Sequence, residues 1–279
     1  MGLARRVHES AWKKMTQRTI LLSCDGPIAT VTLNRPEALN AISLKLVADL
    51  NAALDEIVAA PSRARCVVLT AAGRAFCVGG DITAHRDRPV DTPPYDLGDV
   101  LERYFNPLLV RLMTLPAPLV VAVNGAAAGA GCPLALCADI VVASQRAYFE
   151  CGFTRLGLIP DLGATWLLPR LIGRARAHAM MLLNQRVSAE EAQHWGMIHQ
   201  CVAPEELHTV ALKTASSLCG MSTPALRATR GAISEALNGS LADALKREAH
   251  IQHGLGYSRD FAEGVAAFFA RRPPAFDEA

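Results

Sequence analysis

The feature that most constrains this 279-residue chain is an apolar run from residue 117 to residue 143. A run of this length could span a membrane as a helix. However, Asn124, Pro133 and Asp139 interrupt it, and it contains three glycines, which do not suit a spanning helix. The run therefore predicts a buried strand, a turn, a helix and a second strand, and no second run of this kind exists. We expect no membrane partner.

The composition agrees with a large buried core. The chain is 51% hydrophobic and 19% charged, which excludes a disordered or purely solvated chain. It has 28 basic and 26 acidic side chains, with a formal net charge of +2. Nucleic-acid binding needs a surplus of Lys and Arg on one face, so this near-balance argues against a nucleic-acid partner.

Cysteine and histidine spacing indicates a cytoplasmic protein without a metal. The eight cysteines form no CxxC pair and lie mostly in apolar segments, so we expect reduced core residues. The eight histidines show no HxxxH or HxH spacing, and a metal site has no support. No continuous apolar segment follows Arg5 and Arg6, as a secretion signal would require.

Local patterns predict an α/β body followed by helices. Residues 1–16 are interpreted as an N-terminal extension, 17–203 as the α/β core and 204–279 as a helical region. The elements expected in the body are a hairpin of strands 19–25 and 28–33, a helix after the cap Ser43 that Pro61 closes, strands 66–69 and 119–123, a loop at 85–98, a helix at 99–114 with a kink at Pro107, and a helix near 130–138. The helix starts expected after it are a capping box from Ser188 to Glu191, the cap Thr223 followed by Pro224, and the caps Ser240 and Ser258.

Two glycine-rich turns could hold a ligand. Gly79 and Gly80 follow a buried strand and could turn a backbone N–H toward a bound group, although an ordinary turn explains them equally well. Residues 124–132 join a strand to an apolar helix, where free N–H groups suit a phosphate or a developing oxyanion. This segment fits neither GxGxxG nor a P-loop, so an oxyanion site is the better interpretation.

Several motifs in one order resemble the enoyl-CoA hydratase/isomerase (crotonase) superfamily. These are NRPEALNAIS at 34–43, AFCVGGD at 75–81, VNGAAAGAG at 123–131, GLIPD at 157–161, SAEEA at 188–192 with GMI at 196–198, and EGVAAF at 263–268. Each motif is weak alone, but together they cover about residues 17–275. The resemblance implies a ClpP/crotonase-like spiral of ββα units with a C-terminal helical trimerisation region. It also implies a homotrimer or a dimer of trimers.

The same resemblance implies an acyl-CoA thioester as the ligand. Its carbonyl oxygen would lie between the backbone N–H groups of Gly80 and Ala130, which would stabilise an enolate. Coenzyme A is then part of the substrate, and no separate cofactor is expected. By the same resemblance, the residues that line the CoA channel are Ala38, Leu39, Ala75 and Phe76. Asp81 is expected to fix its turn rather than to take part in the reaction.

The sequence departs from the hydratases of this superfamily. Hydration needs one group to activate water and an acid to protonate carbon. By the same resemblance, the hydratases carry a Glu at two positions of the site. This sequence has Pro133 and Phe153 at those positions. We therefore expect Phe153 to form an apolar wall that favours a bulky or aromatic acyl group.

Asp161 is the one remaining candidate acid in that neighbourhood. Dienoyl-CoA isomerases and ring-epoxide phenylacetyl-CoA isomerases of the superfamily look similar here, with an Asp just after the turn. A single carboxylate suits an isomerase, because it can take a proton from C2 or C4 and return it two carbons away. The alternative is that Asp161 caps the helix that begins near Gly163.

Other charged residues have structural interpretations. Glu150 is expected to be solvated or paired, and Asp139 to be a structural cap. His85 could reach a CoA phosphate, although a loop histidine is more often simply exposed. The arginines interpreted as surface residues are Arg170, Arg174 and Arg176.

The sequence thus predicts an acyl-CoA isomerase. It would shift a double bond in an unsaturated acyl-CoA or rearrange a ring-epoxidised aryl-acetyl-CoA, with Asp161 as the proton shuttle. Two alternatives remain open. One is a 2-enoyl-CoA hydratase with a rearranged acid/base set that uses Asp161 or Glu150, and the other is a non-catalytic acyl-CoA binder.

Overall fold

The strands of the protein form two sheets. The computed structural model describes residues 19–60, 64–83 and 96–276. The larger sheet has the order β1-β2-β3-β5-β7-β10, and the smaller has the order β4-β6-β8-β9. The strands are β1 (Ile20–Asp25), β2 (Ile28–Leu33), β3 (Cys66–Ala71), β4 (Ala75–Cys77), β5 (Leu119–Val123), β6 (Ala126–Ala128), β7 (Ile140–Ser144), β8 (Tyr148–Glu150), β9 (Val187–Ser188) and β10 (Gln200–Val202).

Three successive pairs of strands build the two sheets together. In each of the pairs β3–β4, β5–β6 and β7–β8, the first strand joins the larger sheet and the second joins the smaller one. Neighbouring strands from these pairs run parallel, whereas β1 with β2 and β8 with β9 run antiparallel. The chain therefore advances as a spiral, and the predicted hairpin of β1 and β2 is confirmed.

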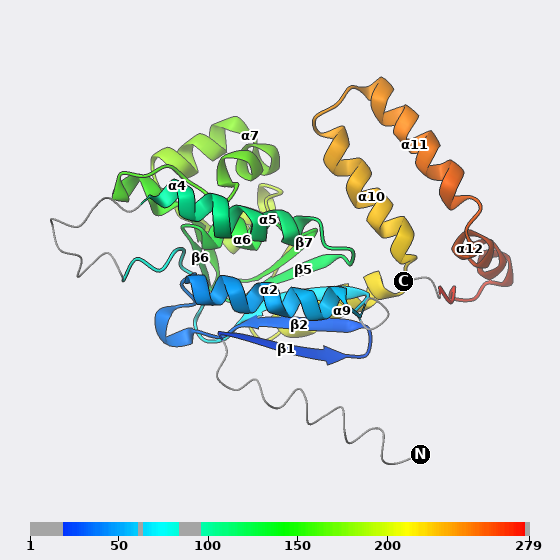
Figure 1. Cartoon of the computed structure of the whole chain (residues 1–279), viewed down its shortest axis with the longest axis horizontal. Helices are drawn as coiled ribbons and strands as arrows, with labels where there is room; N and C mark the ends of the chain where they lie inside the picture. The colour runs from blue at the N-terminus through cyan, green and yellow to red at the C-terminus, as the bar shows by residue number, and fades with distance from the viewer. Residues whose placement is uncertain (1–18, 61–63, 84–95, 277–279) are drawn as a thin grey trace, which may run out of the picture.

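Helices lie between and beyond these strands (Figure 1). The helical elements are η1 (Pro36–Ala38), α2 (Leu44–Val58), α4 (Leu97–Val100), the π-helical turn η3 (Leu101–Phe105), α5 (Asn106–Met113), α6 (Gly131–Leu136), η4 (Gly152–Leu156), α7 (Ala164–Leu182), α8 (Ala189–His194), α9 (Leu207–Cys219), α10 (Thr223–Ala236), α11 (Leu241–Leu255) and α12 (Arg259–Ala270). Ser43 caps α2 by accepting a hydrogen bond from the Leu46 N–H at 3.2 Å. The capping box at Ser188 and Glu191 and the caps Ser240 and Ser258 are also confirmed.

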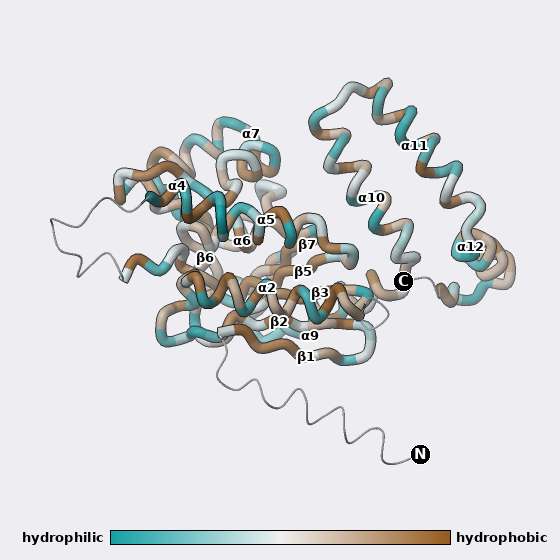
Figure 2. Tube along the Cα trace, viewed as in Figure 1, coloured by the Kyte–Doolittle hydropathy of each residue, from teal (hydrophilic) through white to brown (hydrophobic). Residues whose placement is uncertain are grey.

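The apolar run forms the centre of the core. It contains β5, β6, α6 and β7, so the predicted strand, helix and strand are confirmed, whereas the segment predicted as a turn contains the short strand β6. All five residues of β5 and all six of α6 are buried. Figure 2 shows hydrophobic residues concentrated along the strands of the body. Among the described helices, none is both long enough and apolar enough to cross a bilayer.

The helix expected at 99–114 begins earlier and is not uniform. Asp96 caps it by accepting a hydrogen bond from the Asp99 N–H at 3.0 Å, and α4 begins at Leu97. A π-helical turn then spans Leu101–Phe105, just before Pro107. Pro107 lies in the first turn of α5, so the irregularity of this helix at the proline includes a π-helical turn just before it.

The C-terminal region consists of one helix on the body and an arm. Helix α9 falls within the range 204–279, yet its buried Leu207, Ala211 and Ala215 pack against strands of the larger sheet. Helices α10, α11 and α12 form the arm, on the right of Figure 1. The cap of α10 is Ser222 rather than Thr223, because the Ser222 hydroxyl accepts the Ala225 N–H. Pro224 still lies in the first turn.

Some expectations concern residues outside the described ranges. These are the N-terminal extension at 1–16, Pro61, most of the loop at 85–98, and His85.

The eight cysteines are all free thiols, and five of them are buried.

We predict that Gly131→Ala lowers the free energy of unfolding by about 3 kcal/mol. A Cβ atom at this position would lie 2.1 Å from the Cys77 carbonyl oxygen, which is backbone and cannot move aside easily. Urea unfolding at matched protein concentration measures the effect. Gly254→Ala in α11 is the control, because its Cβ would meet nothing within 4 Å. We expect it to change stability by less than about 1 kcal/mol, and equal effects of the two variants would contradict the prediction.

Candidate active site

A cavity of about 460 Å³ brings several of the predicted site residues together. Gly80, Ala130, Phe153 and Asp161 all line it, although they come from four separate segments of the chain. Much of its remaining wall is apolar. The large apolar side chains include Leu97, Leu101, Phe105, Leu156 and Leu158.

The Gly80 turn is fixed by hydrogen bonds on both sides of that residue. The Ile42 N–H donates to the Gly79 oxygen at 2.7 Å, and the Asp81 N–H donates to the Ile42 oxygen at 3.0 Å. This pairing uses the neighbouring peptide groups and leaves the Gly80 N–H itself without an acceptor among the described residues. Gly79 has a φ of +103°, a conformation that glycine adopts readily.

Ala130 supplies the second free N–H. It is the residue before α6, and its N–H also has no acceptor within the described part of the chain. The two turns are in close contact, because a Cβ on Gly79 would lie 3.2 Å from the Ala130 nitrogen. Helix α6 has only six residues, so the free N–H matters here more than a long helix dipole.

Asp161 lies on a tight turn that leads into α7. Leu162 and Gly163 both adopt left-handed conformations, with φ values of 47° and 75°. The residue that precedes α7 is Gly163, and no side chain caps the helix. Asp161 contributes only its backbone oxygen, which accepts the Ala164 N–H at 3.0 Å. The alternative interpretation of Asp161 as a side-chain cap therefore finds no support in the structure.

No other described residue pairs with the Asp161 carboxyl group, whose one hydrogen bond comes from its own backbone N–H. Its Oδ1 atom is buried and has no hydrogen-bond partner among the described residues. Burial raises the pKa of Asp161 to about 6, because an apolar environment disfavours the charged form. Such a carboxyl group can gain and lose a proton near neutral pH, as a general base requires.

The other acids near the site are paired, as the sequence predicts. Asp81 lines the cavity but accepts hydrogen bonds from Arg35 and Thr83, which hold its turn. Glu150 lies outside the cavity and pairs with Arg155 at 3.3 Å and with Arg186 at 3.1 Å.

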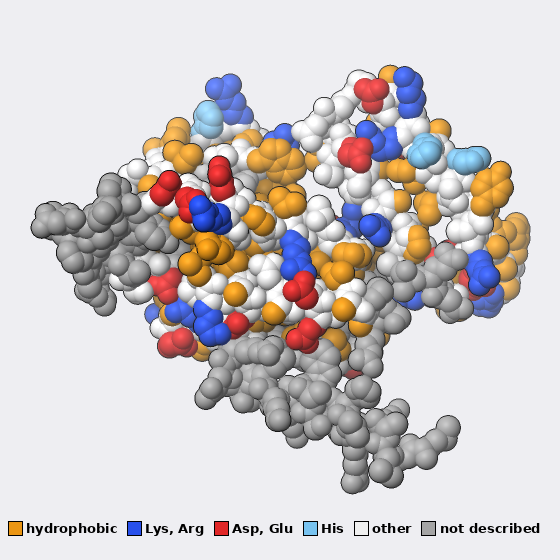
Figure 3. Space-filling view, viewed as in Figure 1, with side chains coloured by type: hydrophobic (Ala, Val, Ile, Leu, Met, Phe, Trp, Pro, Cys, Tyr) orange, Lys and Arg blue, Asp and Glu red, His pale blue; other side chains and the backbone are white. Residues whose placement is uncertain are grey.

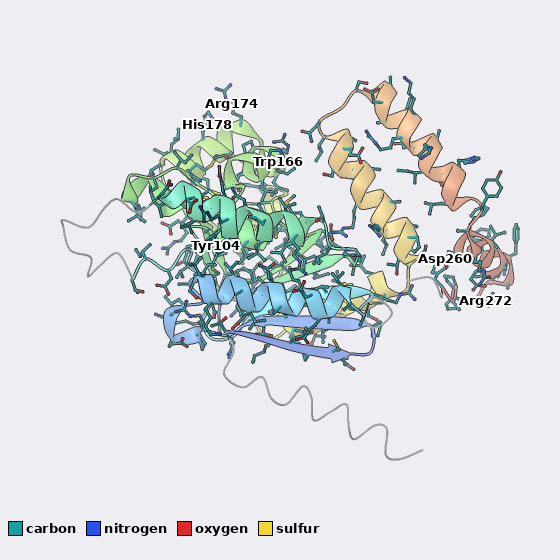
Figure 4. The ribbon with its side chains drawn as sticks, in the orientation of Figure 1. Tyr104, Trp166, Arg174, His178, Asp260 and Arg272 are labelled. Carbon is teal, nitrogen blue, oxygen red and sulfur yellow. The ribbon has the colours of Figure 1, made fainter. Side chains whose placement is uncertain are left out.

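The remaining charged residues that the sequence analysis considered do not line the cavity. Asp139 accepts the backbone N–H of Leu119 at 2.7 Å and pairs with Arg230 of the arm at 2.7 Å. Arg170, Arg174 and Arg176 are exposed. Arg174 projects outward from α7 beside His178 (Figure 4).

None of the four residues predicted to line a CoA channel belongs to the lining of this cavity. Ala38 and Leu39 form the end of η1, and both are half-buried. Ala75 and Phe76 belong to β4 and are 3% and 0% exposed, with the Phe76 side chain inside the main core. Their side chains do not reach the surface, so contact with a ligand at β4 would have to use the backbone.

Sequence reasoning missed the wall made by α4 and η3. Leu97, Leu101 and Phe105 are spaced four residues apart, and all three line the cavity. That spacing is visible in the sequence, but it does not show which way the stripe faces. Within the described ranges, no group of three or more His, Cys, Asp or Glu could hold a metal.

Comparisons with known proteins identify the family of this chain. A model of the enoyl-CoA hydratase/isomerase family matches residues 24–279. The chain is 46% identical over 259 residues to the 1,2-epoxyphenylacetyl-CoA isomerase of Escherichia coli K12, which covers 92% of this chain and 97% of that protein. It is 41% identical over 262 residues to a Rhodobacter capsulatus protein described as a probable enoyl-CoA hydratase, which covers 94% and 99% of the two chains.

The chain also has the same fold as solved structures of enoyl-CoA hydratases. An enoyl-CoA hydratase from Bacillus anthracis matches with a TM-score of 0.86 at 29% identity, covering 94% of this chain and all of that one. An enoyl-CoA hydratase/isomerase from Cupriavidus metallidurans matches with a TM-score of 0.85 at 30% identity, covering 93% and 96%. The fold is therefore the crotonase fold. The chain belongs to the enoyl-CoA hydratase/isomerase family.

We predict that Asp161→Asn stabilises the protein at pH 7.5. The folded-state pKa of Asp161 is raised from 3.8 to about 6, so the folded state must bear a buried charge above pH 6 that the unfolded state bears in water. Asparagine removes this cost. Because part of the side chain is exposed, we expect a gain of about 1 kcal/mol.

Urea unfolding at pH 7.5 and pH 4 measures this effect. At pH 4 the wild-type carboxyl group is protonated in the folded state and about half protonated when unfolded, so the gain should largely disappear. A variant that is less stable than the wild type at both pH values would instead support a capping role for Asp161.

Proposed function

We propose that the protein is an acyl-CoA isomerase. The observation that supports this best is the carboxyl group of Asp161, which pairs with no other described residue, in a cavity that also presents the free N–H groups of Gly80 and Ala130. Hydration of an enoyl thioester uses a second acid, and the described lining offers only Asp81, which is paired with Arg35. Moving a proton requires one base, whereas adding water requires two groups.

The proposed reaction has two proton transfers. Asp161 takes a proton from C2 or C4 of the acyl group, and the electron pair moves into the thioester carbonyl to give a dienolate. The N–H groups of Gly80 and Ala130 donate hydrogen bonds to that oxygen, each worth on the order of 3 kcal/mol in a dry site. The protonated Asp161 then returns the proton two carbons away, so the double bond shifts and no atom is gained or lost.

The cavity walls support a bulky or aromatic acyl group. Phe153 and Phe105 line the cavity with several leucines, and Phe153 occupies the position where a hydratase would be expected to have an acid. The relative from E. coli is named for 1,2-epoxyphenylacetyl-CoA. We therefore include a ring-epoxidised aryl-acetyl-CoA, besides an unsaturated acyl-CoA, among the proposed substrates. Coenzyme A arrives as part of the substrate, and no separate cofactor is proposed.

The arm supports a proposed homotrimer or dimer of trimers. Its helices expose large apolar side chains in a single chain, and orange side chains gather over α12 in Figure 3. Phe268 and Phe269 are 78% and 80% exposed. Exposed apolar area of this kind marks an association surface. Sedimentation equilibrium should give a mass of three or six copies of the 29.8-kDa chain, and a monomer at micromolar concentration would contradict this proposal.

We predict that Asp161→Asn lowers kcat for isomerisation by about 10³-fold. An amide cannot accept the proton, but it keeps the size of the side chain, so affinity for the CoA ester should change little. The wild-type kcat/KM should rise with pH through an apparent pKa of about 6, because the base must be ionised. Turnover by the variant at the wild-type rate would contradict the proposal.

Two further assays separate the alternatives. Crotonyl-CoA incubated with the enzyme should give little or no 3-hydroxyacyl-CoA, and rapid hydration would favour the hydratase alternative. Proton exchange in deuterated water, at C2 of 3-enoyl and aryl-acetyl CoA esters and at C4 of 2-enoyl CoA esters, reports enolate formation directly. Tight binding of every ester without exchange would instead indicate a non-catalytic binder.

A further inference from the structure

Arg35 contacts both of the backbone segments that hold the Gly80 turn. One guanidinium nitrogen, Nη1, donates to the Ala41 oxygen at 2.7 Å, and the other, Nη2, contacts Asp81 Oδ2 at 2.9 Å. Ala41 directly precedes Ile42, whose two backbone hydrogen bonds flank Gly80. The guanidinium therefore closes a ring of contacts around the peptide that carries the Gly80 N–H.

Asn40 anchors this ring to the body of the protein. Its side chain is fully buried, and its Oδ1 accepts the Arg35 N–H at 2.8 Å. Its Nδ2 donates to the oxygens of Ala72 and Ala75, each at 2.9 Å, on the two sides of the turn between β3 and β4. Arg35 thus acts from a backbone that is itself held in place.

The positive charge of Arg35 compensates the negative charge of Asp81 beside the cavity. Asp81 is next to Gly80 in the chain and lines the same cavity. Hydrogen bonds from Thr83 and from Arg35 hold the pKa of Asp81 below its usual value, so it is charged at neutral pH. A carboxylate near a developing enolate raises the energy of that enolate unless a cation compensates its charge. The Arg35 and Asp81 side chains are only 20% and 16% exposed, so solvent screens this charge weakly.

We propose that Arg35 is a positioning residue for the reaction, which compensates the charge of Asp81 beside the forming enolate and, through its own hydrogen bond to Ala41, holds the segment next to Gly80. This inference rests on the proposed function of the same site. It differs from a purely structural ion pair in one respect. Loss of a purely structural pair lowers stability and changes kcat only through the fold, whereas loss of charge compensation lowers kcat in a folded enzyme when the cation is removed and the anion stays.

The test compares Arg35→Met, Asp81→Asn and the double variant. We expect Arg35→Met to lower kcat by about tenfold or more with KM changed by less than about twofold. Asp81→Asn should lower kcat by less than about threefold, because it removes the opposing charge together with the pair. The double variant should recover much of the loss seen in Arg35→Met, and Arg35→Lys, which keeps the charge, should recover part of it.

A control for loss of an ion pair outside the cavity uses Arg111 and Asp55, although Asp55 is 73% exposed. Arg111 also joins two elements, through the Asp55 carboxylate and through the backbone and side-chain oxygens of Asn51, but neither member of the ion pair lines the cavity. Arg111→Met and Asp55→Asn should leave kcat within about twofold of the wild type. Thermal unfolding of every variant shows whether a loss of activity comes from loss of the fold.

A spectroscopic measurement reports the carbonyl directly. Cinnamoyl-CoA bound in the Asp161→Asn background should absorb at longer wavelength than free cinnamoyl-CoA, because two N–H donors polarise its carbonyl. We expect Arg35→Met in the same background to lose half or more of this shift. An undiminished shift would overturn the role of Arg35 but not the oxyanion site. Equal losses of kcat in Arg35→Met and Asp81→Asn, without recovery in the double variant, would have the same meaning. No shift with Arg35 in place would overturn the oxyanion site as well.

Discussion

The structure depends on a contact between two stretches of backbone that no side chain separates. A Cβ on Gly125 would lie 2.1 Å from the Arg74 oxygen, and a Cβ on Gly131 would lie 2.1 Å from the Cys77 oxygen. Only glycine permits such an approach at these two points. The contact places the turn after β4 against the turn before α6, and it is the reason that the N–H groups of Gly80 and Ala130 line one cavity.

An apolar interior then determines what chemistry the site can support. Residues 117–143 supply buried strands and a buried helix, and leucine and phenylalanine side chains form much of the cavity wall. In these surroundings an unpaired carboxyl group is costly, which is why the pKa of Asp161 is raised. Asp81, Asp139 and Glu150 avoid this cost by pairing with arginines. Burial therefore leaves Asp161 as the one acid suited to proton transfer among the described lining residues.

Much of the fold could be predicted because local signals and burial agree. Ser43 and Ser188 are followed by apolar residues at helical spacing, and both begin helices. The sequence was less informative where several polar residues compete. Ser222 and Thr223 are both good caps, and backbone geometry selects Ser222. Helix α9 looks like part of the helical tail, but its small residues Ala211 and Ala215 let it pack closely on the sheet. Periodicity alone does not show which surface a helix will cover.

The sequence by itself determined the types of residue available for the site and the order of the elements. The glycine turns, the Asp after the GLIP motif, and the absence of acids at Pro133 and Phe153 are all visible without coordinates. Only the tertiary structure decided that Gly80, Ala130 and Asp161 share one cavity, that Arg35 neutralises Asp81, and that Leu97, Leu101 and Phe105 form its wall. The physical reason is that hydrogen bonding and desolvation depend on distances in space. Those distances are set by packing between segments far apart in the chain.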